Sequence, residues 1–391
     1  MKVDFDTVID RRNTNSIKYD FSAEYGMGAD VLPLWVADMD FQAPPAVLAG
    51  LQRAVAHGIF GYTEVKEDYD TPFIDWYAKR FGYCFTAGDI VKAPGVVFAL
   101  HQIVRAFTEP GDAVIVQTPV YYPFYHVIEN NGRKLVKNPL VYENGAYTID
   151  FVDFEQKIRT HNVKLFILCS PHNPVSRVWT REELETLNAI CQRHDVLVAA
   201  DEIHCDFVYP GHRHTCFGLL NGDAIVATAP SKTFNLAGLQ ASQIIIKNPE
   251  LRVRLTDELR KTGYGQLNTL GLVACRSAYL HGESWLEQLK EYLEENTRVT
   301  RAFLAEHLPK VRLVEPQGTY LLWLDFTAYG LSQAELDRRI TQGARLWLDS
   351  GTMFGPEGVG FQRINIACPR STLTTALDRL AREFCQREEP S

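Results

Sequence analysis

Short apolar runs alternate with longer amphipathic stretches between about residues 85 and 250, and this alternation limits the folds open to the chain. The apolar runs are residues 113–116, 165–168, 196–200, 224–227 and 243–246. The stretches between them are long enough for crossover helices, and Thr180 with Glu183 forms a capping-box pattern that predicts the start of one helix. Strands separated by such connections predict an α/β layer with a mostly parallel central sheet.

The residues after about 285 follow a different pattern. A polar helix is predicted over residues 285–304 and another helix over residues 333–340. Strands are predicted over residues 311–314, 319–325 and 361–367. Ser371 is expected to cap a final helix, whose apolar face comprises Leu373, Leu377, Leu380 and Phe384. A chain of 391 residues is expected to form more than one domain, and this second part is predicted to be a smaller α+β domain.

Polar side chains follow three of the predicted strands at the points where the strands end. Asn173 follows residues 165–169, Asp201 follows residues 196–200, and Lys232 follows the apolar run that ends at Ala229. Open α/β sheets bind ligands at the carboxyl ends of their strands. A desolvated lysine there loses its charge, and the free amine forms a Schiff base with an aldehyde. Asp201 is expected to keep a pyridine nitrogen protonated, so the predicted cofactor is pyridoxal phosphate.

These segments belong to a longer set of motifs, namely residues 34–41, 60–63, 201–206, 231–238, 316–325 and 363–370. Together the motifs resemble the fold-type I pyridoxal phosphate enzymes of the class I/II aminotransferase superfamily. More narrowly, the chain is similar to the cystathionine beta-lyase group of the bifunctional maltose-regulon-modulator type. The resemblance implies an amino-terminal arm that joins the small domain (residues 1–50), a large cofactor-binding domain (51–284) and a small carboxy-terminal domain (285–391).

The resemblance also implies roles for single residues. Lys232 is expected to carry the cofactor, Asp201 to contact the ring nitrogen, and Asn173 to contact the ring hydroxyl and the substrate. Tyr121 is expected to stack on the ring as a third catalytic residue. Arg363 is expected to hold the substrate's α-carboxylate, because a planar guanidinium suits that task. Three further side chains complete the implied set: Trp35 at the substrate entrance, His204 beside the cofactor, and Tyr62, which reaches the phosphate of a neighbouring subunit.

The phosphate site departs from many relatives. An arginine eight residues after the lysine is common, whereas this chain has Gln240. The phosphate is therefore expected to depend on the backbone N–H groups of Gly95, Val96 and Val97 at a helix start, and on the hydroxyl of Ser231.

The implied reaction is β-elimination from L-cystathionine or related cysteine S-conjugates. The amine of Lys232 removes the α-proton, a thiolate leaves the β-carbon, and pyruvate and ammonia follow. An aminotransferase shares the early steps and is the main alternative. The usual tyrosine of aminotransferases is replaced here by His204, which favours the lyase. A regulatory role through protein binding is a further alternative, because one relative of this type combines it with catalysis.

Composition and charge limit the partners. The formal net charge of −8 argues against nucleic acid, and no apolar run approaches the length of a membrane helix. The amino terminus lacks the apolar core of a signal peptide, and the eight cysteines are scattered, so reduced thiols and a cytoplasmic location are expected. The spacing of the histidines and cysteines between His204 and Cys216 fits no common zinc pattern, so no metal is expected. A homodimer with shared active sites is expected from Tyr62.

Overall fold

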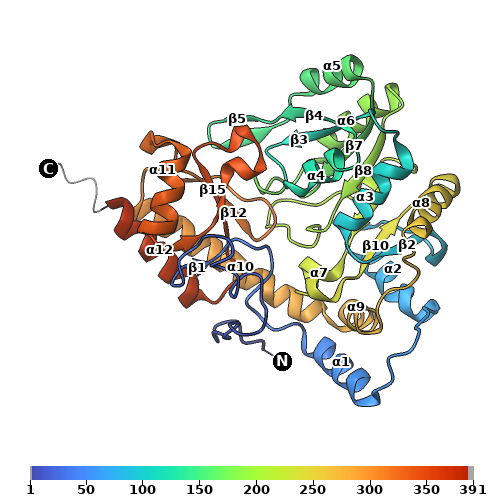
Figure 1. The fold of residues 1–391 in the computed structure, drawn as a ribbon, viewed down its shortest axis with the longest axis horizontal. Helices are drawn as coiled ribbons and strands as arrows, with labels where there is room; N and C mark the ends of the chain where they lie inside the picture. Colours follow the sequence, from blue (N-terminus) through green and yellow to red (C-terminus); the bar gives the residue numbers. More distant parts are fainter. Residues whose placement is uncertain (1, 386–391) are drawn as a thin grey trace.

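The structure is a computed structural model that describes residues 2–385. Its largest sheet has seven strands in the order β2-β10-β9-β8-β7-β3-β4 (Figure 1). These strands are β2 (Ile90–Ala93), β3 (Ala113–Thr118), β4 (Lys134–Pro139), β7 (Val163–Cys169), β8 (Leu197–Asp201), β9 (Ile225–Thr228) and β10 (Ser242–Ile245). All neighbouring pairs from β9 to β4 are parallel, whereas β10 runs antiparallel to both of its neighbours. The predicted α/β fold with a mostly parallel sheet is confirmed.

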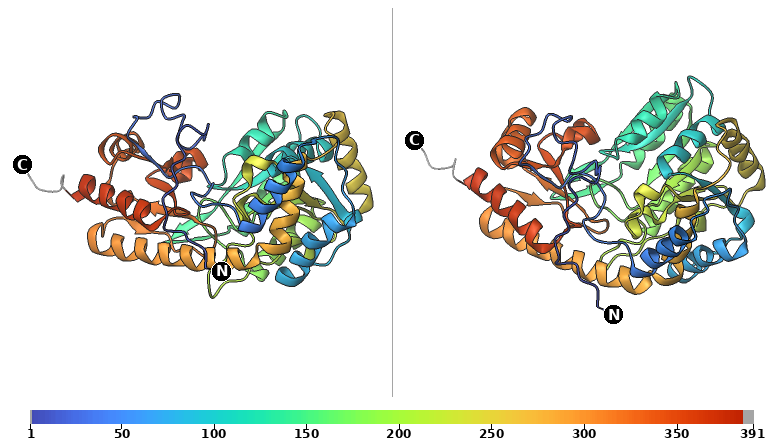
Figure 2. Two further views of the ribbon diagram at one scale, coloured as in Figure 1. Left: turned by 90° about the horizontal axis from the view of Figure 1, so that it is seen from below. Right: turned by 60° about the horizontal axis from the view of Figure 1, so that its bottom comes forward.

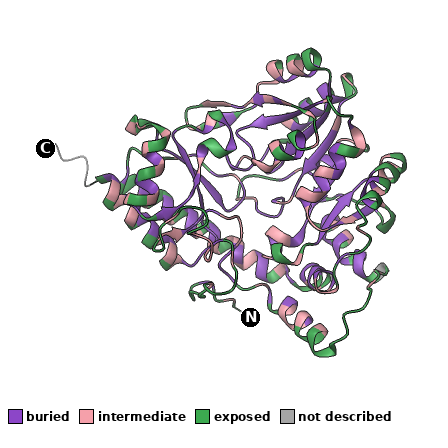
Figure 3. Cartoon of the chain, viewed as in Figure 1, coloured by how far each residue is buried: buried purple, intermediate pink, exposed green. Residues whose placement is uncertain are grey.

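Helices cover both faces of this sheet. Successive side chains of a strand point to opposite faces of the sheet. Because helices cover both faces, the inner strands are apolar on both. Val114 and Val116 pack in one core with α3 (Val96–Phe107), α4 (Pro123–Glu129) and α8 (Pro249–Lys261). Ala113 and Ile115 pack in another core with α5 (Phe151–His161) and α6 (Arg181–Arg193). Figure 3 shows the strands as buried and the outward helix surfaces as exposed.

The carboxy-terminal elements form a second sheet of four antiparallel strands in the order β11-β12-β15-β14. The strands are β11 (Arg312–Leu313), β12 (Leu321–Asp325), β14 (Asp349–Ser350) and β15 (Phe361–Asn365). The helices of this part are α10 (Glu283–His307), α11 (Gln333–Arg338) and α12 (Arg370–Cys385). The prediction that Ser371 caps the last helix is wrong, because the helix already begins at Arg370, directly after Pro369. Its predicted apolar face is buried.

The amino-terminal segment lies beside these carboxy-terminal elements (Figures 1 and 2). β1 (Leu32–Pro33) pairs in parallel with β13 (Leu346–Trp347), and the ring of Phe5 contacts Trp285 and Tyr292 of α10. The chain then continues into α1 (Pro45–His57) and α2 (Glu67–Phe81), both of which contact α9 (Thr269–His281). The domain boundaries near residues 50 and 284 stay a prediction. Residues 1 and 386–391, which the predicted domains include, lie outside the described part of the chain.

β5 (Val141–Glu143) and β6 (Ala146–Thr148) form a hairpin, and α7 (Pro230–Thr233) is a single short turn after β9. In residues 2–385 no helix combines the length and the apolar character needed to cross a membrane.

Candidate active site

The polar residues at or just after the carboxyl ends of β7, β8 and β9 line one cavity of about 280 Å³. Parallel pairing places Cys169 of β7 opposite Asp201 of β8, and Asp201 opposite Ala227 of β9, so the three strands end side by side. The predicted residues that line the cavity are Gly95, Val96, Val97, Tyr121, Asn173, Asp201, His204, Ser231 and Lys232. The sheet therefore brings most of the predicted cofactor site together at one edge.

Lys232 lies on α7, the short turn that follows β9. Its Nζ donates a hydrogen bond of 2.7 Å to the backbone oxygen of Ala37. Burial lowers the pKa of the Lys232 amine to about 8, although the carboxylates of Asp38 and Asp201 oppose this shift. A substantial share of the amine is therefore neutral near neutral pH, as a nucleophile requires.

Asp201 is a buried carboxylate without a tight cationic partner among the described residues. Its Oδ1 accepts a hydrogen bond from the backbone N–H of Ile203 at 3.1 Å, and burial raises its pKa to about 7. A buried carboxylate is stabilised by a cation that it can hydrogen-bond. A protonated pyridine nitrogen would supply both the charge and the hydrogen, so this residue fits pyridoxal phosphate.

The other end of the cavity fits a phosphate group. α3 begins at Val96 after Gly95, and no side chain of the described residues caps its first turn. Gly95, Val96 and Val97 line the cavity, so the free N–H groups of this helix start are available to an anion there. A Cβ at Gly95 would meet no atom of the described chain within 4 Å, which shows that this side is open. Ser231 and Gln240 also line the cavity. Gln240, eight residues after Lys232, is uncharged.

Two aromatic residues lie against the same cavity. Tyr121 follows the end of β3, and its ring lies 5.5 Å from that of Tyr122. The imidazole of His204 is buried, and burial together with the nearby charges of Lys232 and Arg363 lowers its pKa well below the ordinary value. His204 is therefore neutral at physiological pH, and its Nδ1 has no hydrogen-bond partner within residues 2–385.

Arg363 lies on β15 and reaches Asn173 across the boundary between the two sheets. Its Nη1 donates to Asn173 Oδ1 at 2.9 Å, and its Nη2 donates to the backbone oxygen of Trp35 at 2.9 Å and to the carboxylate of Asp349. The guanidinium is 3% exposed and lies over the ring of Phe354. Because Asn173 lines the cavity, the guanidinium of Arg363 lies directly beside that cavity.

The segment that contains Ala37 is held by two asparagines that the sequence analysis did not identify. Asn235 accepts from the N–H of Met39 and donates to the oxygens of Met39 and Phe41. Asn365 donates to the oxygens of Val36 and Asp38. The only sequence signal for a role of these two asparagines is that they lie within the motifs of residues 231–238 and 363–370. These contacts fix the carbonyl that accepts the hydrogen bond of Lys232.

A group of four charged side chains, of which Lys18 and Asp40 are buried, supports the same segment. Lys18 has no exposed surface, and its Nζ lies 3.0 Å from Asp40 and 3.5 Å from Asp38. Arg11 forms ion pairs with both carboxylates at 2.6 and 2.8 Å. Two cations and two carboxylates balance one another, which is the arrangement in which buried charges are tolerated.

Besides Arg363, which contacts Asn173 but does not itself line the Lys232 cavity, two further predicted residues lie outside it. The indole of Trp35 stacks on Trp347 with ring centroids 4.4 Å apart, while its backbone oxygen binds Arg363. Tyr62 is fully exposed and lines a separate open cavity with residues 263–270. The roles of both residues stay predictions.

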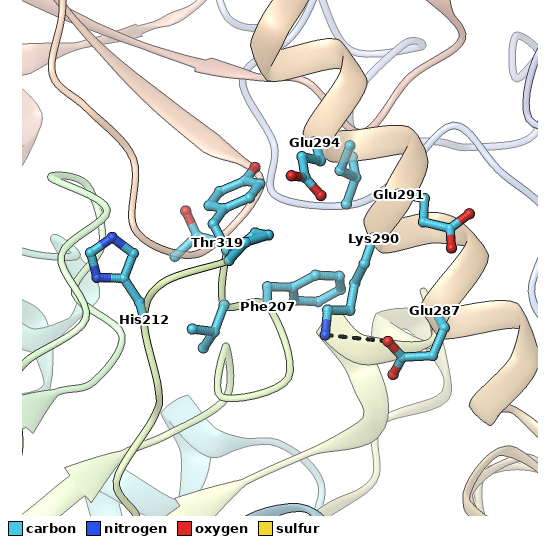
Figure 4. A pocket seen from close by; sticks show the side chains of 11 residues that line it. Phe207, His212, Glu287, Lys290, Glu291, Glu294 and Thr319 are labelled. Atoms are coloured by element: carbon cyan, nitrogen blue, oxygen red, sulfur yellow. Dashed lines mark ion pairs between the residues drawn. The ribbon is translucent and has the colours of Figure 1, made fainter.

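A further cavity of about 300 Å³ lies between residues 207–212 and α10 (Figure 4). Lys290 pairs there with Glu287 at 3.4 Å, and Glu291 and Glu294 face the same space. None of the predicted site residues lines it. Within residues 2–385, no group of three or more His, Cys, Asp or Glu side chains is placed to hold a metal ion.

Known proteins resemble this chain along nearly its whole length. Cystathionine beta-lyase PatB of Bacillus subtilis is 46% identical over 97% of this chain and 99% of its own. Protein MalY of Escherichia coli is 32% identical over 95% of this chain and 96% of its own. Cystalysin from Treponema denticola, solved with pyridoxal 5'-phosphate, has a TM-score of 0.95 at 38% identity and covers 99% of this chain and 100% of its own.

A pyridoxal-phosphate-bound C-S lyase from Staphylococcus hominis matches with a TM-score of 0.91 at 34% identity, over 98% of each chain. The family model described as aminotransferase class I and II matches residues 29–380, which include each residue placed in the Lys232 cavity. This chain belongs to the aminotransferase class I and II family.

Proposed function

We propose that this protein is a pyridoxal-phosphate-dependent carbon-sulfur β-lyase that cleaves L-cystathionine or related cysteine S-conjugates. The observation that carries the proposal is the meeting of Lys232, Asp201 and Asn173 in one cavity beside Arg363. Lyases and C-S lyases among its relatives support the reaction type.

Each residue then has a defined task. The guanidinium of Arg363 binds the α-carboxylate of the substrate, and Asn173 fixes the orientation of that guanidinium. The neutral Nζ of Lys232 takes the proton from the substrate's α-carbon, which its lowered pKa permits. The carboxylate of Asp201 would hold the cofactor by its ring nitrogen and keep that nitrogen protonated. When bound, pyridoxal phosphate supplies the sink for the electrons of the broken C–H bond.

The leaving group completes the reaction. The bond between the β-carbon and sulfur breaks, the sulfur departs with the electron pair, and Lys232 can pass its proton to the thiolate. The remaining three-carbon fragment hydrolyses to pyruvate and ammonia. Neutral His204 lines this cavity and adds no charge that would oppose the protonated ring.

The experiment follows the products formed from L-cystathionine. The purified protein is supplied with pyridoxal phosphate, and pyruvate and free thiol are measured with and without an added keto acid. The proposal predicts equal amounts of pyruvate and thiol without a keto acid. Lys232→Ala should abolish both, whereas Lys79→Ala, a change at a surface lysine, should leave both unchanged. Amino transfer that needs a keto acid, without release of thiol, would replace the lyase by an aminotransferase.

We also propose that the protein works as a homodimer in which Tyr62 reaches the phosphate site of the partner. Tyr62, Ile59 and Phe60 are strongly exposed apolar or aromatic side chains on one short segment, which is unusual for a surface that faces only water. Mixing inactive Lys232→Ala with weakened Tyr62→Ala protein tests the proposal. Recovery of activity on mixing supports shared sites, and a monomer in light scattering would contradict them.

The cysteines support a reducing, cytoplasmic location for this enzyme. All eight are free, and six of them are buried.

A further inference from the structure

Arg363 already has a carboxylate partner within the chain. β14 and β15 pair in an antiparallel register that places Asp349 directly opposite Arg363. The Asp349 carboxylate contacts Nη2 of Arg363, and both side chains are only 3% exposed. Such a pair is stable when buried only because the two charges offset one another.

The donors of Arg363 are largely committed in this arrangement. A guanidinium has five N–H groups, of which Nη2 carries two. Nη2 donates both to Trp35 and to Asp349, and Nη1 donates to Asn173. Nε is buried and has no partner within residues 2–385. A substrate carboxylate needs two parallel donors, so one of the present acceptors has to yield.

We propose that Asp349 is a positioning residue that stands in for the substrate's α-carboxylate on Arg363 and gives up that contact when substrate binds. The inference rests on the proposed function, because it assumes that Arg363 receives the substrate. Asp349 is the acceptor that yields. The other two acceptors, the backbone oxygen of Trp35 and Oδ1 of Asn173, belong to segments that the rest of the fold holds in place. The oxygen of Trp35 is part of the backbone next to β1, and Asn173 lines the Lys232 cavity in the segment that follows β7.

Protonation of the Asp349 carboxylate compensates for the loss of its contact with Arg363. Burial raises the pKa of Asp349, and the charge and hydrogen bond of Arg363 lower it. Once a substrate carboxylate shares Arg363, the cation no longer offsets Asp349 fully, and the buried carboxyl takes a proton from solvent. The other titratable groups that face Asp349 are Tyr121 and Tyr122, and burial raises the pKa of both phenols. They stay neutral from pH 6 to 8 and cannot supply the proton.

The test measures proton uptake when the holoenzyme binds 3-(methylthio)propionate, a carboxylate that lacks the reactive amino group. Calorimetry in phosphate and in Tris buffer gives the number of protons bound, because the two buffers have different ionisation enthalpies. The wild type should take up protons, more at pH 6.5 than at pH 8, and should bind the probe more tightly at the lower pH. Asp349→Asn keeps the shape and an acceptor for Arg363, and should lose both the uptake and its share of the pH dependence.

The outcomes separate the two proposals. Equal proton uptake in the wild type and in Asp349→Asn would overturn the role of Asp349, as would binding by the wild type without uptake. If Asp349→Asn does not fold, a wild type that binds the probe without taking up protons still overturns the role of Asp349. If instead Arg363→Ala binds the probe as well as the wild type, or the neutral 3-(methylthio)propanamide binds equally, the proposed role of Arg363 itself fails.

Discussion

The lowered pKa of Lys232 makes a quantitative prediction for the rate at which the protein without cofactor takes up pyridoxal phosphate. Only the neutral amine attacks the aldehyde. With the pKa lowered by burial to about 8, roughly a quarter of Lys232 is neutral at pH 7.5. An ordinary lysine, with a value of 10.5, would be about 0.1% neutral at the same pH. The structure therefore predicts a rate advantage of about 200-fold from ionisation alone.

The pH dependence distinguishes this explanation from others. Between pH 7 and pH 9 the neutral fraction of Lys232 rises about tenfold and then levels off, whereas that of an ordinary lysine rises about a hundredfold and continues to rise. The rate is followed by stopped-flow absorbance of the lysine-bound cofactor. Division by the rate with Nα-acetyl-lysine at each pH removes the ionisation of pyridoxal phosphate itself.

Two results would refute the reasoning. One is a protein rate that stays proportional to that of Nα-acetyl-lysine from pH 7 to pH 10, because the amine would then have an ordinary pKa. The other is a fast absorbance change that persists in Lys232→Ala, because the reacting amine would then be another lysine. Asp38→Asn gives a matched check, since loss of that carboxylate removes an attraction that raises the pKa of Lys232. This variant should move the plateau to lower pH.

Three further changes test other parts of the site. Asp201→Asn should retain bound cofactor but lower kcat for β-elimination by at least ~100-fold, as expected for loss of a positioned proton-handling group. Unchanged kcat would remove Asp201 from the mechanism. Arg363→Ala should raise KM for L-cystathionine by roughly 10-fold to 100-fold, since a hydrogen bond to a charged group contributes ~1.5–3 kcal/mol. An unchanged KM would show that the α-carboxylate binds elsewhere. Asp40→Ala should lower the free energy of unfolding by ~3–5 kcal/mol in urea denaturation, because it leaves buried Lys18 without its nearest carboxylate. A loss below ~1 kcal/mol would mean that Asp38 compensates fully.

Much of the fold was predictable because buried strands and amphipathic helices leave separate patterns. The inner strands of the large sheet are apolar on both faces and were recognised as continuous runs. The capping box at Thr180 was predicted, and its two reciprocal hydrogen bonds with Glu183 are present. The two strands of this sheet that were not predicted, β2 and β4, lie at its edges. Lysines interrupt their apolar pattern there, because an edge strand has exposed positions.

The candidate site was predictable in the residues that follow strands and in those carried by recognised motifs. Asp349 could not be found in this way. It follows a run of only three apolar residues (346–348), which is too short to predict a strand, and its partner Arg363 is 14 residues further on. Only the register of β14 against β15 places them opposite each other. The pairing of Lys18 with Asp40 is similar, since 22 residues separate them and no local pattern joins them.

The central claim is that Lys232 carries the cofactor in a site that eliminates a thiol. Borohydride reduction of the protein with pyridoxal phosphate, followed by peptide mass spectrometry, locates the bound lysine, and the same preparation is assayed with L-cystathionine before and after reduction. The structure predicts a pyridoxyl group on Lys232, with pyruvate and thiol formed before reduction and neither afterwards. A pyridoxyl group on a different lysine, or elimination that survives reduction of Lys232, would contradict the claim.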